Sequence, residues 1–272
     1  MDGSIVPYAP RYRRHVHALT RRHPTYFHLD WQPITSWYRA TDNPSALIYD
    51  GRGDLTGVLL LTPIRQGVTW IRLLTMADNS IFEGLIQYIQ ASYPIEQIAA
   101  LESQPWLIPL LARAGFRQFD RIIHLERPSS PINPSDYPLL TIRRAQQREF
   151  STIAQVDQAA FSPHWQMDAE DFRYMLRYTV WFTVAVVDDT IVGYQLSTVH
   201  SFSVHLTRLA VLPTWQGRGI GRALVENLIE KFPRKTVTVN TQASNMASQQ
   251  LYQHLGFRYQ HWETPVWHWS NR

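Results

Sequence analysis

A glycine-rich turn between a β-rich run and a helical run restricts the fold more than any other part of this sequence. Residues 209–222 read LAVLPTWQGRGIGR, so an apolar run ends at a proline and a turn with three glycines begins a helix. Without a Cβ at Gly217, Gly219 and Gly221, a ligand can approach the backbone closely. The aligned N–H groups at the start of a helix attract phosphates. The turn therefore predicts a pyrophosphate-binding loop.

Two common phosphate-binding loops do not fit this turn. It lacks the Lys-Ser or Lys-Thr pair with which a P-loop contacts a γ-phosphate and Mg²⁺. The Gly-x-Gly-x-x-Gly spacing of a dinucleotide-binding turn is also absent, and no acidic residue follows the next predicted strand. The sequence therefore disfavours nucleotide hydrolysis and hydride transfer.

Hydrophobic periodicity around the turn predicts an α+β fold. The expected strands in the middle of this region follow one another as hairpins, whereas a doubly wound sheet would alternate strands with helices. We expect a hairpin turn at Asp188 and Asp189, and a helix that Asn245 caps and Gly256 ends. The expected strands are residues 139–143, 181–187, 191–199, 204–212, 236–241, 257–263 and 266–269, and the expected helices are residues 150–160, 168–178, 218–232 and 245–255.

The first half of the chain repeats parts of the second half. Residues 104–116 match residues 245–257, and both segments read as a helix that ends at Gly-Phe. Residues 85–94 match residues 224–233, and both read as a helix that ends at a proline. The two matches occur in the same order at nearly one offset, which indicates an internal duplication. Between the halves, residues 128–138 carry four prolines and little that could pack, as expected of a linker.

Two motifs in the second half together resemble the GNAT acetyltransferases. The first, Val-x-Pro-x-x-Gln-x-x-Gly-x-Gly, is met by residues 211–221. The second, an Asn followed by Ala, Leu-Tyr and Gly-Phe on the next helix, is met by residues 245–257. The resemblance covers the entire second half and, within the family, is similar to the bacterial branch that includes the ribosomal-protein alanine acetyltransferases. It implies two acyl-CoA N-acyltransferase domains, each a mixed, mostly antiparallel sheet flanked by helices.

The resemblance implies acetyl-CoA as the acyl donor. Its pantetheine arm would pair with the backbone of Leu209 and Val211 like an added strand, where this strand and residues 236–241 splay apart. The glycine turn would hold the pyrophosphate, and Asn245 would contact the arm. The residues that the resemblance assigns to acetyl-CoA are Leu209, Ala210, Val211, Gln216, Gly217, Arg218, Gly219, Ile220, Gly221, Arg222, Asn245, Ser248 and Tyr252.

Two residues are candidates for proton transfer. Tyr252 stands at the family's general-acid position, where it would protonate the departing CoA thiolate, although a tyrosine on an amphipathic helix can also simply pack in a core. His205 stands six residues before the motif's Val, at the family's general-base position, and an imidazole with a pKa of about 6.5 suits that task. Thr207, on the same face, could order a water. His200, Arg208 and a chain of waters are the other candidates for the base.

The N-terminal half lacks the glycine turn. The residues that match Gln216, Gly217, Gly219 and Gly221 are Ala77, Asp78, Ser80 and Phe82, and Leu111 matches Tyr252. A carboxylate and a bulky ring in place of the glycines disfavour a phosphate. We therefore expect a degenerate, non-catalytic GNAT-like domain in residues 1–127, a linker in residues 128–138, and a catalytic domain in residues 139–272.

The acceptor is less well defined than the donor. The resemblance implies direct acetyl transfer in a ternary complex to a primary amine, which could belong to a protein N-terminus, a lysine or a small molecule. The family's acceptor site involves the loop that here carries His164 and Trp165. Asp168, Glu170 and Asp171 do not by themselves define an acidic pocket for a polyamine. A longer acyl donor and a non-catalytic module that senses CoA or acyl-CoA are the alternatives.

Composition excludes several other kinds of site. The chain has no cysteine, so it has no disulfide framework, thiolate metal site or cysteine nucleophile, and we expect no bound metal. Its net charge of +4 is divided evenly between the halves, which is poor evidence for a nucleic-acid partner. No apolar run approaches the roughly 20 residues that span a bilayer, so we expect a cytoplasmic protein without a membrane partner. The duplication favours a monomer or a weak homodimer.

Overall fold

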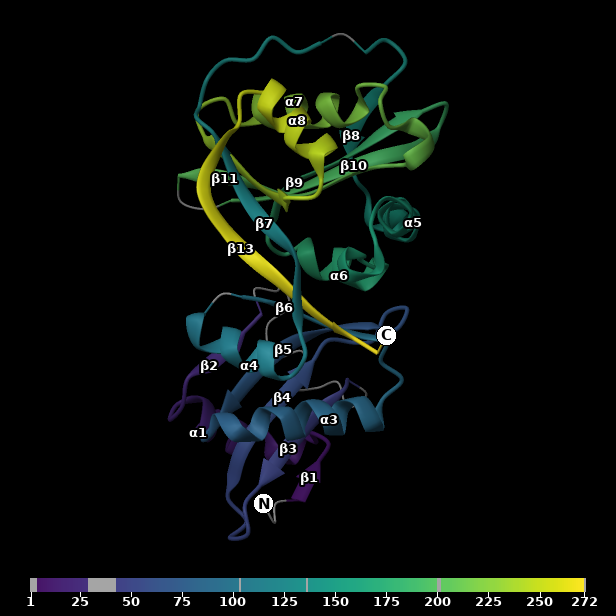
Figure 1. The fold of residues 1–272 in the computed structure, drawn as a ribbon. Coiled ribbons are helices and arrows are strands. Elements are labelled where there is room, and N and C mark those ends of the chain that lie inside the picture. Colours follow the sequence, from purple (N-terminus) through teal and green to yellow (C-terminus); the bar gives the residue numbers. More distant parts are fainter. Residues whose placement is uncertain (1–3, 29–42, 103, 136, 200–201, 272) are drawn as a thin grey trace. The chain divides into compact units, whose positions relative to one another are not determined.

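A computed structural model describes residues 4–28, 43–102, 104–135, 137–199 and 202–271 of the chain (Figure 1). The chain forms two compact units. The N-terminal unit consists of Met1–Asp120 and Thr264–Arg272, and the C-terminal unit consists of Arg121–Glu263. None of the helices among the described residues is long and apolar enough to span a lipid bilayer.

The sheet of the C-terminal unit has one parallel pair of strands. Among the described residues, β11 (Ser203–Val211) and β12 (Thr236–Gln242) run parallel, and the other neighbouring strands of this unit run antiparallel. The predicted hairpin between β9 and β10 is confirmed, because Asp188 and Asp189 adopt the left-handed conformation, with φ of 46° and 60°. The strand order is β8 (Thr141–Arg144), β9 (Thr179–Val187), β10 (Thr190–Val199), β11 (Ser203–Val211), β12 (Thr236–Gln242) and the end of β7 (Arg117–Arg127).

Helices cover both faces of this sheet. α5 (Phe150–Ala160) and α6 (Ala169–Met175) lie on one face, and α7 (Ile220–Lys231) and α8 (Met246–His254) lie on the other (Figure 1). α7 begins after Gly219 and buries an apolar face, including Leu224 and Leu228, at helical spacing. Leu228 packs in an apolar cluster with residues of β11 and β12, and Leu224 packs in a second cluster with Val211, which anchors the glycine turn at the end of β11.

The N-terminal unit repeats this arrangement. Its β5 and β6 form the one parallel pair among the described strands of the unit, as β11 and β12 do in the other unit. A helix that ends before Pro94 follows β5, as the duplication predicts. The strands are β1 (Ser4–Val6), β2 (Thr25–Phe27), β3 (Ser45–Tyr49), β4 (Leu55–Leu61), β5 (Val68–Met76), β6 (Gln97–Leu101) and the end of β13 (Arg258–Ser270), and the helices are α1 (Arg13–Thr20), α3 (Phe82–Ser92) and α4 (Ile108–Arg113). Single 3₁₀ turns lie at Pro10–Tyr12, Asn79–Ile81, Pro105–Leu107, Gln147–Glu149, Pro163–Trp165 and Pro213–Trp215.

The two repeats exchange their last strands. Residues 122–127 of β7 pair with β12 and belong to the C-terminal unit, although β7 starts in the N-terminal repeat. Residues 266–270 of β13 pair with β6 and belong to the N-terminal unit. The units therefore differ from the boundaries predicted at residues 127 and 138, because sequence periodicity shows where a strand lies but not which partner it pairs with.

Two expectations near these strands need correction. The predicted strands 257–263 and 266–269 are one strand, β13. It continues through Pro265, whose carbonyl accepts a hydrogen bond from the Glu102 N–H although the proline has no N–H to donate.

The segment 128–138 also departs from the expectation that it has little to pack against. The Arg127 guanidinium donates to the carbonyls of Leu255 (2.8 Å) and Ser130 (3.0 Å), and the buried Glu226 accepts from the Ser135 N–H (3.0 Å). This segment is therefore bound to the C-terminal unit along its described residues.

Candidate active site

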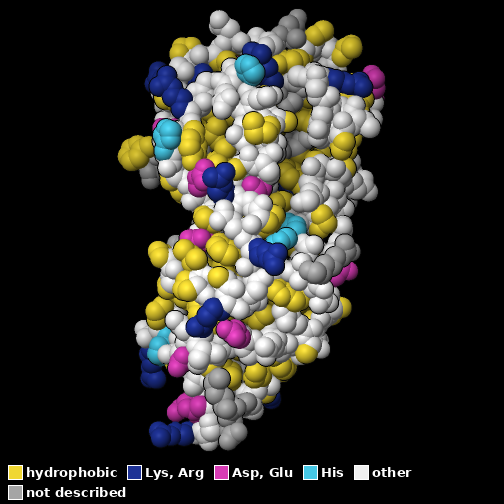
Figure 2. Space-filling view, in the orientation of Figure 1, with side chains coloured by type: hydrophobic (Ala, Val, Ile, Leu, Met, Phe, Trp, Pro, Cys, Tyr) yellow, Lys and Arg dark blue, Asp and Glu magenta, His cyan; other side chains and the backbone are white. Residues whose placement is uncertain are grey.

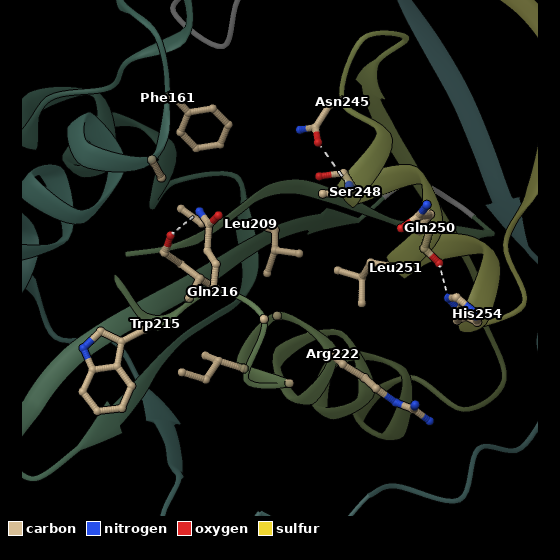
Figure 3. Close-up of a pocket in the computed structure, with 18 residues that line it drawn as sticks. Phe161, Leu209, Trp215, Gln216, Arg222, Asn245, Ser248, Gln250, Leu251 and His254 are labelled. Atoms are coloured by element: carbon tan, nitrogen blue, oxygen red, sulfur yellow. Dashed lines mark hydrogen bonds between the residues drawn. The ribbon is translucent and has the colours of Figure 1, made fainter. Parts of the chain in front are cut away.

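A pocket of about 450 Å³ lies in the C-terminal unit, between the end of α5, β11, the glycine turn and the start of α8 (Figure 3). It brings together residues from Ala160 to His254, which are 94 positions apart in the sequence. Of the residues predicted to bind the donor, the pocket is lined by Leu209, Ala210, Val211, Gln216, Gly217, Gly219, Ile220, Gly221, Arg222, Asn245 and Ser248. Arg218, Tyr252 and His205 are not among its lining residues.

The pocket exists because β11 and β12 separate. Their parallel pairing runs from Ser203 opposite Thr236 to Leu206 opposite Val239 and then stops, although both strands continue. On its other side β11 remains paired with β10 as far as Val211, with a β-bulge at Thr207. Among the described residues, the edge of β11 beyond Leu206 thus has no strand on the β12 side. Backbone groups on such an edge can bind an extended ligand as an added strand.

The glycine turn has the geometry of an anion site. Gly217 and Gly219 are left-handed, with φ of 74° and 81°, a conformation that side chains disfavour. The first N–H groups of the twelve-residue α7 have no intrahelical partner, and Gly219, which precedes the helix, provides no side chain to cap them. These donors and the helix dipole favour a negative group at this end of the pocket.

The two arginines of the turn have different surroundings. Arg222 lines the pocket, and its Nε donates to Glu226 Oε1 at 2.6 Å; this hydrogen bond and the carboxylate charge raise the pKa of Arg222. The Arg218 guanidinium instead lies over the ring of Trp215, 4.6 Å from its centroid. Of the two, the structure therefore directs Arg222 rather than Arg218 to the pocket.

Two amides shape the rest of the pocket. Asn245 caps α8 as predicted, because its Oδ1 accepts from the Ser248 N–H at 3.1 Å. Its Nδ2 group makes no hydrogen bond with any described residue and can serve a ligand. Gln216 Nε2 donates to the Val211 carbonyl at 3.0 Å, so this side chain braces the turn against the strand.

Tyr252 lies beside the pocket rather than in it. The side chain is 4% exposed, and its ring packs on Phe257. It belongs to the same apolar core as Leu206 and Val239, the last pair before β11 and β12 separate. Burial raises the pKa of Tyr252, so the hydroxyl stays protonated at neutral pH, as a proton donor requires.

The candidates for the base are sorted by their contacts. His205 is half-buried on β11, and its Nδ1 lies 2.9 Å from Thr238 Oγ1. Thr207 Oγ1 lies 3.2 Å from Thr198 Oγ1, on the β10 side of the strand. Arg208 is unsuited to the task, because it forms an ion pair with a buried carboxylate and its pKa is raised despite burial. His200 lies outside the described residues.

The acidic residues considered for an acceptor pocket serve another purpose. Asp168 and Asp171 cap α6 reciprocally, each accepting from the other's backbone N–H at 2.9 Å. Glu170 is largely exposed and pairs with Arg173. These carboxylates therefore do not gather into an acidic pocket.

The N-terminal unit has filled the equivalent gap with its own chain. β5 and β6 pair from Val68 to Trp70 and then separate. Beyond that point β2 pairs with Leu73–Thr75 of β5, and since β4 already pairs with the other edge of β5, β2 lies on the β6 side. The Tyr26 hydroxyl, on a fully buried side chain, accepts from the Leu101 N–H of β6 at 3.2 Å. A strand thus occupies the position that is open in the C-terminal unit.

Several lining residues were not anticipated from the sequence. Leu251 and His254 follow Ser248 at three-residue steps on α8, so helical spacing from the capping Asn245 could have identified them. Phe161, at the end of α5, carries no local signal of this kind.

Comparison with known proteins gives the following likenesses. A family model described as "Acetyltransferase (GNAT) family" matches residues 141–257. The ribosomal protein bS18-alanine N-acetyltransferase of Salmonella typhimurium is 36% identical over 73 residues, which is 26% of this chain and 49% of that enzyme. The chain therefore spans about half the length of this curated relative.

Two solved structures resemble the whole chain in fold. A tandem GNAT protein from the clavulanic acid biosynthesis pathway has a TM-score of 0.61 and 14% identity, over 99% of this chain and 98% of that one. A GCN5-related N-acetyltransferase from Anabaena variabilis has a TM-score of 0.72 and 11% identity, over 98% of this chain and 72% of that one. Identities this low bear on the fold alone.

Proposed function

This chain belongs to the GNAT acetyltransferase family through residues 141–257, and from this membership we propose that it transfers the acetyl group of acetyl-CoA directly to a primary amine. Its two units are GNAT-like domains in tandem. The observation that carries the proposal is a single pocket in which an uncapped helix N-terminus and the open edge of a strand meet. These are the two features that a phosphorylated, extended thioester requires.

The donor would bind with its pyrophosphate at the glycine turn and its acyl end farther along β11. The pyrophosphate would bind the first N–H groups of α7 with the Arg222 side chain beside it. The pantetheine arm would then extend along β11 past Leu209, with Asn245 Nδ2 on its other side. This direction places the thioester near Thr207, where β11 and β12 rejoin.

The reaction is one acyl transfer within a ternary complex. The amine nitrogen forms a bond to the acetyl carbonyl carbon, the carbon–sulfur bond breaks, and the thiolate takes a proton from Tyr252, which regains one from the nitrogen as the amide forms. The ammonium proton is lost to a base, for which we propose His205, acting directly or through water. Holding both reactants in place contributes up to roughly 7–11 kcal/mol in ideal cases, more than either proton transfer.

We further propose one donor site per chain, in the C-terminal unit. The N-terminal unit lacks the glycine turn, and β2 occupies its gap. On the face shown in Figure 2, the Lys and Arg side chains lie in small separate groups, which favours an amine acceptor over nucleic acid. The named relative makes a protein N-terminal alanine the first acceptor to test, before lysine and small amines.

Calorimetric titration with acetyl-CoA tests the proposal. The parent protein should bind at one site per chain, and Gly219→Glu, which places a carboxylate at the start of α7, should abolish binding. Gly53→Glu is the control for a glutamate in a left-handed conformation, because Gly53 (φ 84°) lies in the N-terminal unit, away from the pocket, and it should bind like the parent. No binding by the parent would refute the proposal.

Turnover separates an enzyme from a sensor of acyl-CoA. Tyr252→Phe keeps the ring but loses the proton donor, so it should lower kcat and leave the affinity for acetyl-CoA unchanged. If the parent binds acetyl-CoA but acetylates no peptide, lysine or small amine, the sensing module becomes the better description.

A further inference from the structure

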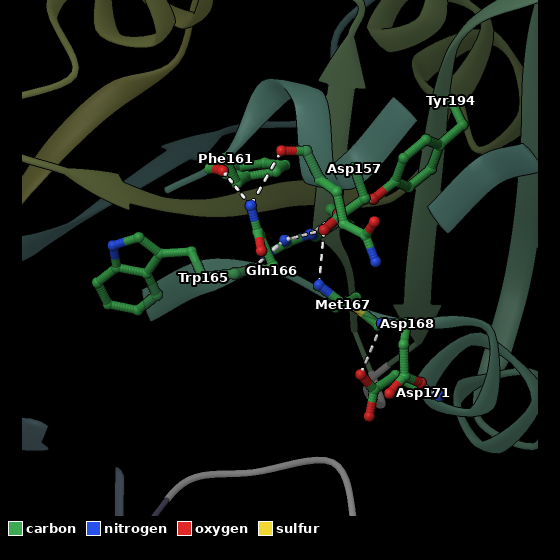
Figure 4. Close-up of polar contacts among 10 residues, drawn as sticks. Asp157, Phe161, Trp165, Gln166, Met167, Asp168, Asp171 and Tyr194 are labelled. Carbon is green, nitrogen blue, oxygen red and sulfur yellow. Dashed lines mark hydrogen bonds and ion pairs between the residues drawn. The ribbon is translucent and has the colours of Figure 1, made fainter. Parts of the chain in front are cut away.

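A cluster of charged and polar side chains lies in the C-terminal unit next to Phe161, which lines the pocket (Figure 4). The carboxylate of Asp157 on α5 is fully buried and forms a bidentate ion pair with Arg208 of β11, with distances of 2.7 Å from Nε to Oδ2 and 2.9 Å from Nη2 to Oδ1. The Tyr194 hydroxyl donates to Oδ2, and the Met167 N–H donates to Oδ1 at 2.6 Å. Each carboxylate oxygen therefore accepts two hydrogen bonds, which fixes its orientation.

The charges in this cluster depend on one another. Burial alone would lower the pKa of Arg208, but the negative charge of the cluster outweighs this and raises it. Burial and the nearby Asp157 carboxylate raise the pKa of Tyr194. The guanidinium is thus held charged although its side chain is only 11% exposed, and it cannot turn away without leaving a buried carboxylate unpaired.

Arg208 in turn supports a wall of the pocket. Its guanidinium carbon lies 3.8 Å from the centroid of the Phe161 ring, and one of its nitrogens donates to the Trp165 carbonyl. Gln166 Nε2 donates to the Phe161 carbonyl at 2.9 Å, which holds the backbone of the same residue. Phe161 lines the pocket, and Figure 3 shows it on the side away from Arg222.

The position of Phe161 relative to β11 indicates which part of a bound ligand it contacts. The glycine turn lies at the C-terminal end of β11, whereas Arg208 adjoins the Thr207 bulge near the point where β11 and β12 rejoin. A ligand that runs from the turn along β11 reaches this point with its far end. In the proposed function that end is the acyl group.

We propose that Phe161, backed by Arg208, limits the length of the acyl group that the pocket admits. The inference rests on the proposed function, since it assumes an acyl-CoA in the pocket. A flexible aliphatic wall would yield to extra methylenes, but a ring stacked on an immobile guanidinium has no room to withdraw. Phe161 is thus a specificity-determining residue for the donor, and Arg208 is a positioning residue that acts through it.

The test compares acetyl-, propionyl- and butyryl-CoA in the full-length protein. For each donor, kcat/KM is measured with one amine, and the dissociation constant is measured with a non-transferable thioether analogue of the same chain length. The parent should prefer the acetyl donor by about tenfold or more for each added methylene. Phe161→Ala should raise the ratio of butyryl to acetyl by at least about tenfold in both measurements.

Leu251→Ala is the matched control, since Leu251 lines the pocket from α8, next to Gly221 of the turn. It should weaken all three donors equally and leave their ratio unchanged. Arg208→Lys retains the positive charge but cannot form the bidentate ion pair, so it should shift the ratio in the direction of Phe161→Ala with Phe161 intact.

Three results would overturn the inference. One is a parent that uses butyryl-CoA as readily as acetyl-CoA. Another is a Phe161→Ala protein that still binds acetyl-CoA but has the same ratio of butyryl to acetyl donor use as the parent. A parent that binds no CoA derivative at all would overturn the proposed function and this inference together, so the two failures are distinguishable.

Discussion

Removing residues 121–127 should cost the C-terminal unit most of its stability. These residues form the end of β7 and pair with β12 from Val237 to Gln242, although they precede the boundary that the sequence suggests. Fragments 121–272 and 128–272 differ by this strand alone. Both keep the segment 128–138, the glycine turn and all of β13.

The magnitude follows from what the strand buries. Ile123 and Leu125 are 7% and 2% exposed, and burying one such side chain contributes about 1.5–3 kcal/mol. Their loss therefore removes roughly 3–6 kcal/mol, before the Arg127 hydrogen bonds to Leu255 and Ser130 are counted. A domain of this size has a free energy of unfolding of about 5–15 kcal/mol, so the shorter fragment should be unfolded or barely folded.

Urea denaturation followed by circular dichroism measures this difference. Fragment 121–272 should unfold in one cooperative transition, whereas fragment 128–272 should show no transition or one lower by at least about 3 kcal/mol. Equal midpoints for the two fragments would show that β12 does not need β7 and that strand exchange is not a structural requirement.

Two further predictions concern the turn and Tyr252. Gly219→Ala should lower the free energy of unfolding by about 1–2 kcal/mol or more, because φ is 81° and the new Cβ would lie 2.9 Å from Tyr137. Gly221→Ala, at a helical φ with its nearest neighbour at 3.5 Å, should not lower it, and thermal unfolding of the pair checks the contrast. Burial raises the pKa of Tyr252 above its ordinary 10.0, so the Tyr252-dependent part of kcat should persist up to pH 10. Above pH 10 the unfolded chain ionises this tyrosine while the folded chain does not, so stability should fall with rising pH, and less so in Tyr252→Phe.

Local chemistry accounts for what could be predicted. The left-handed φ values at Gly217 and Gly219, the cap at Asn245 and the hairpin at Asp188 depend on neighbours within a few residues. Such features are encoded by residue type and spacing, and they located the turn and its helix correctly. The α+β class and the repeated order of elements follow from the same periodicity.

Tertiary pairing accounts for the rest. An edge of a strand accepts any partner with compatible backbone groups, so the periodicity of β7 and β13 does not show that they exchange units, nor that β2 fills the gap beside β5. Local sequence patterns are equally insufficient to predict which residues line the site. Phe161 packs against Arg208, 47 residues later, which Asp157 holds in place, and no local pattern links Arg208 to the other two positions. The sequence by itself determined the turn that we propose as the phosphate site, and long-range packing determined the space around it.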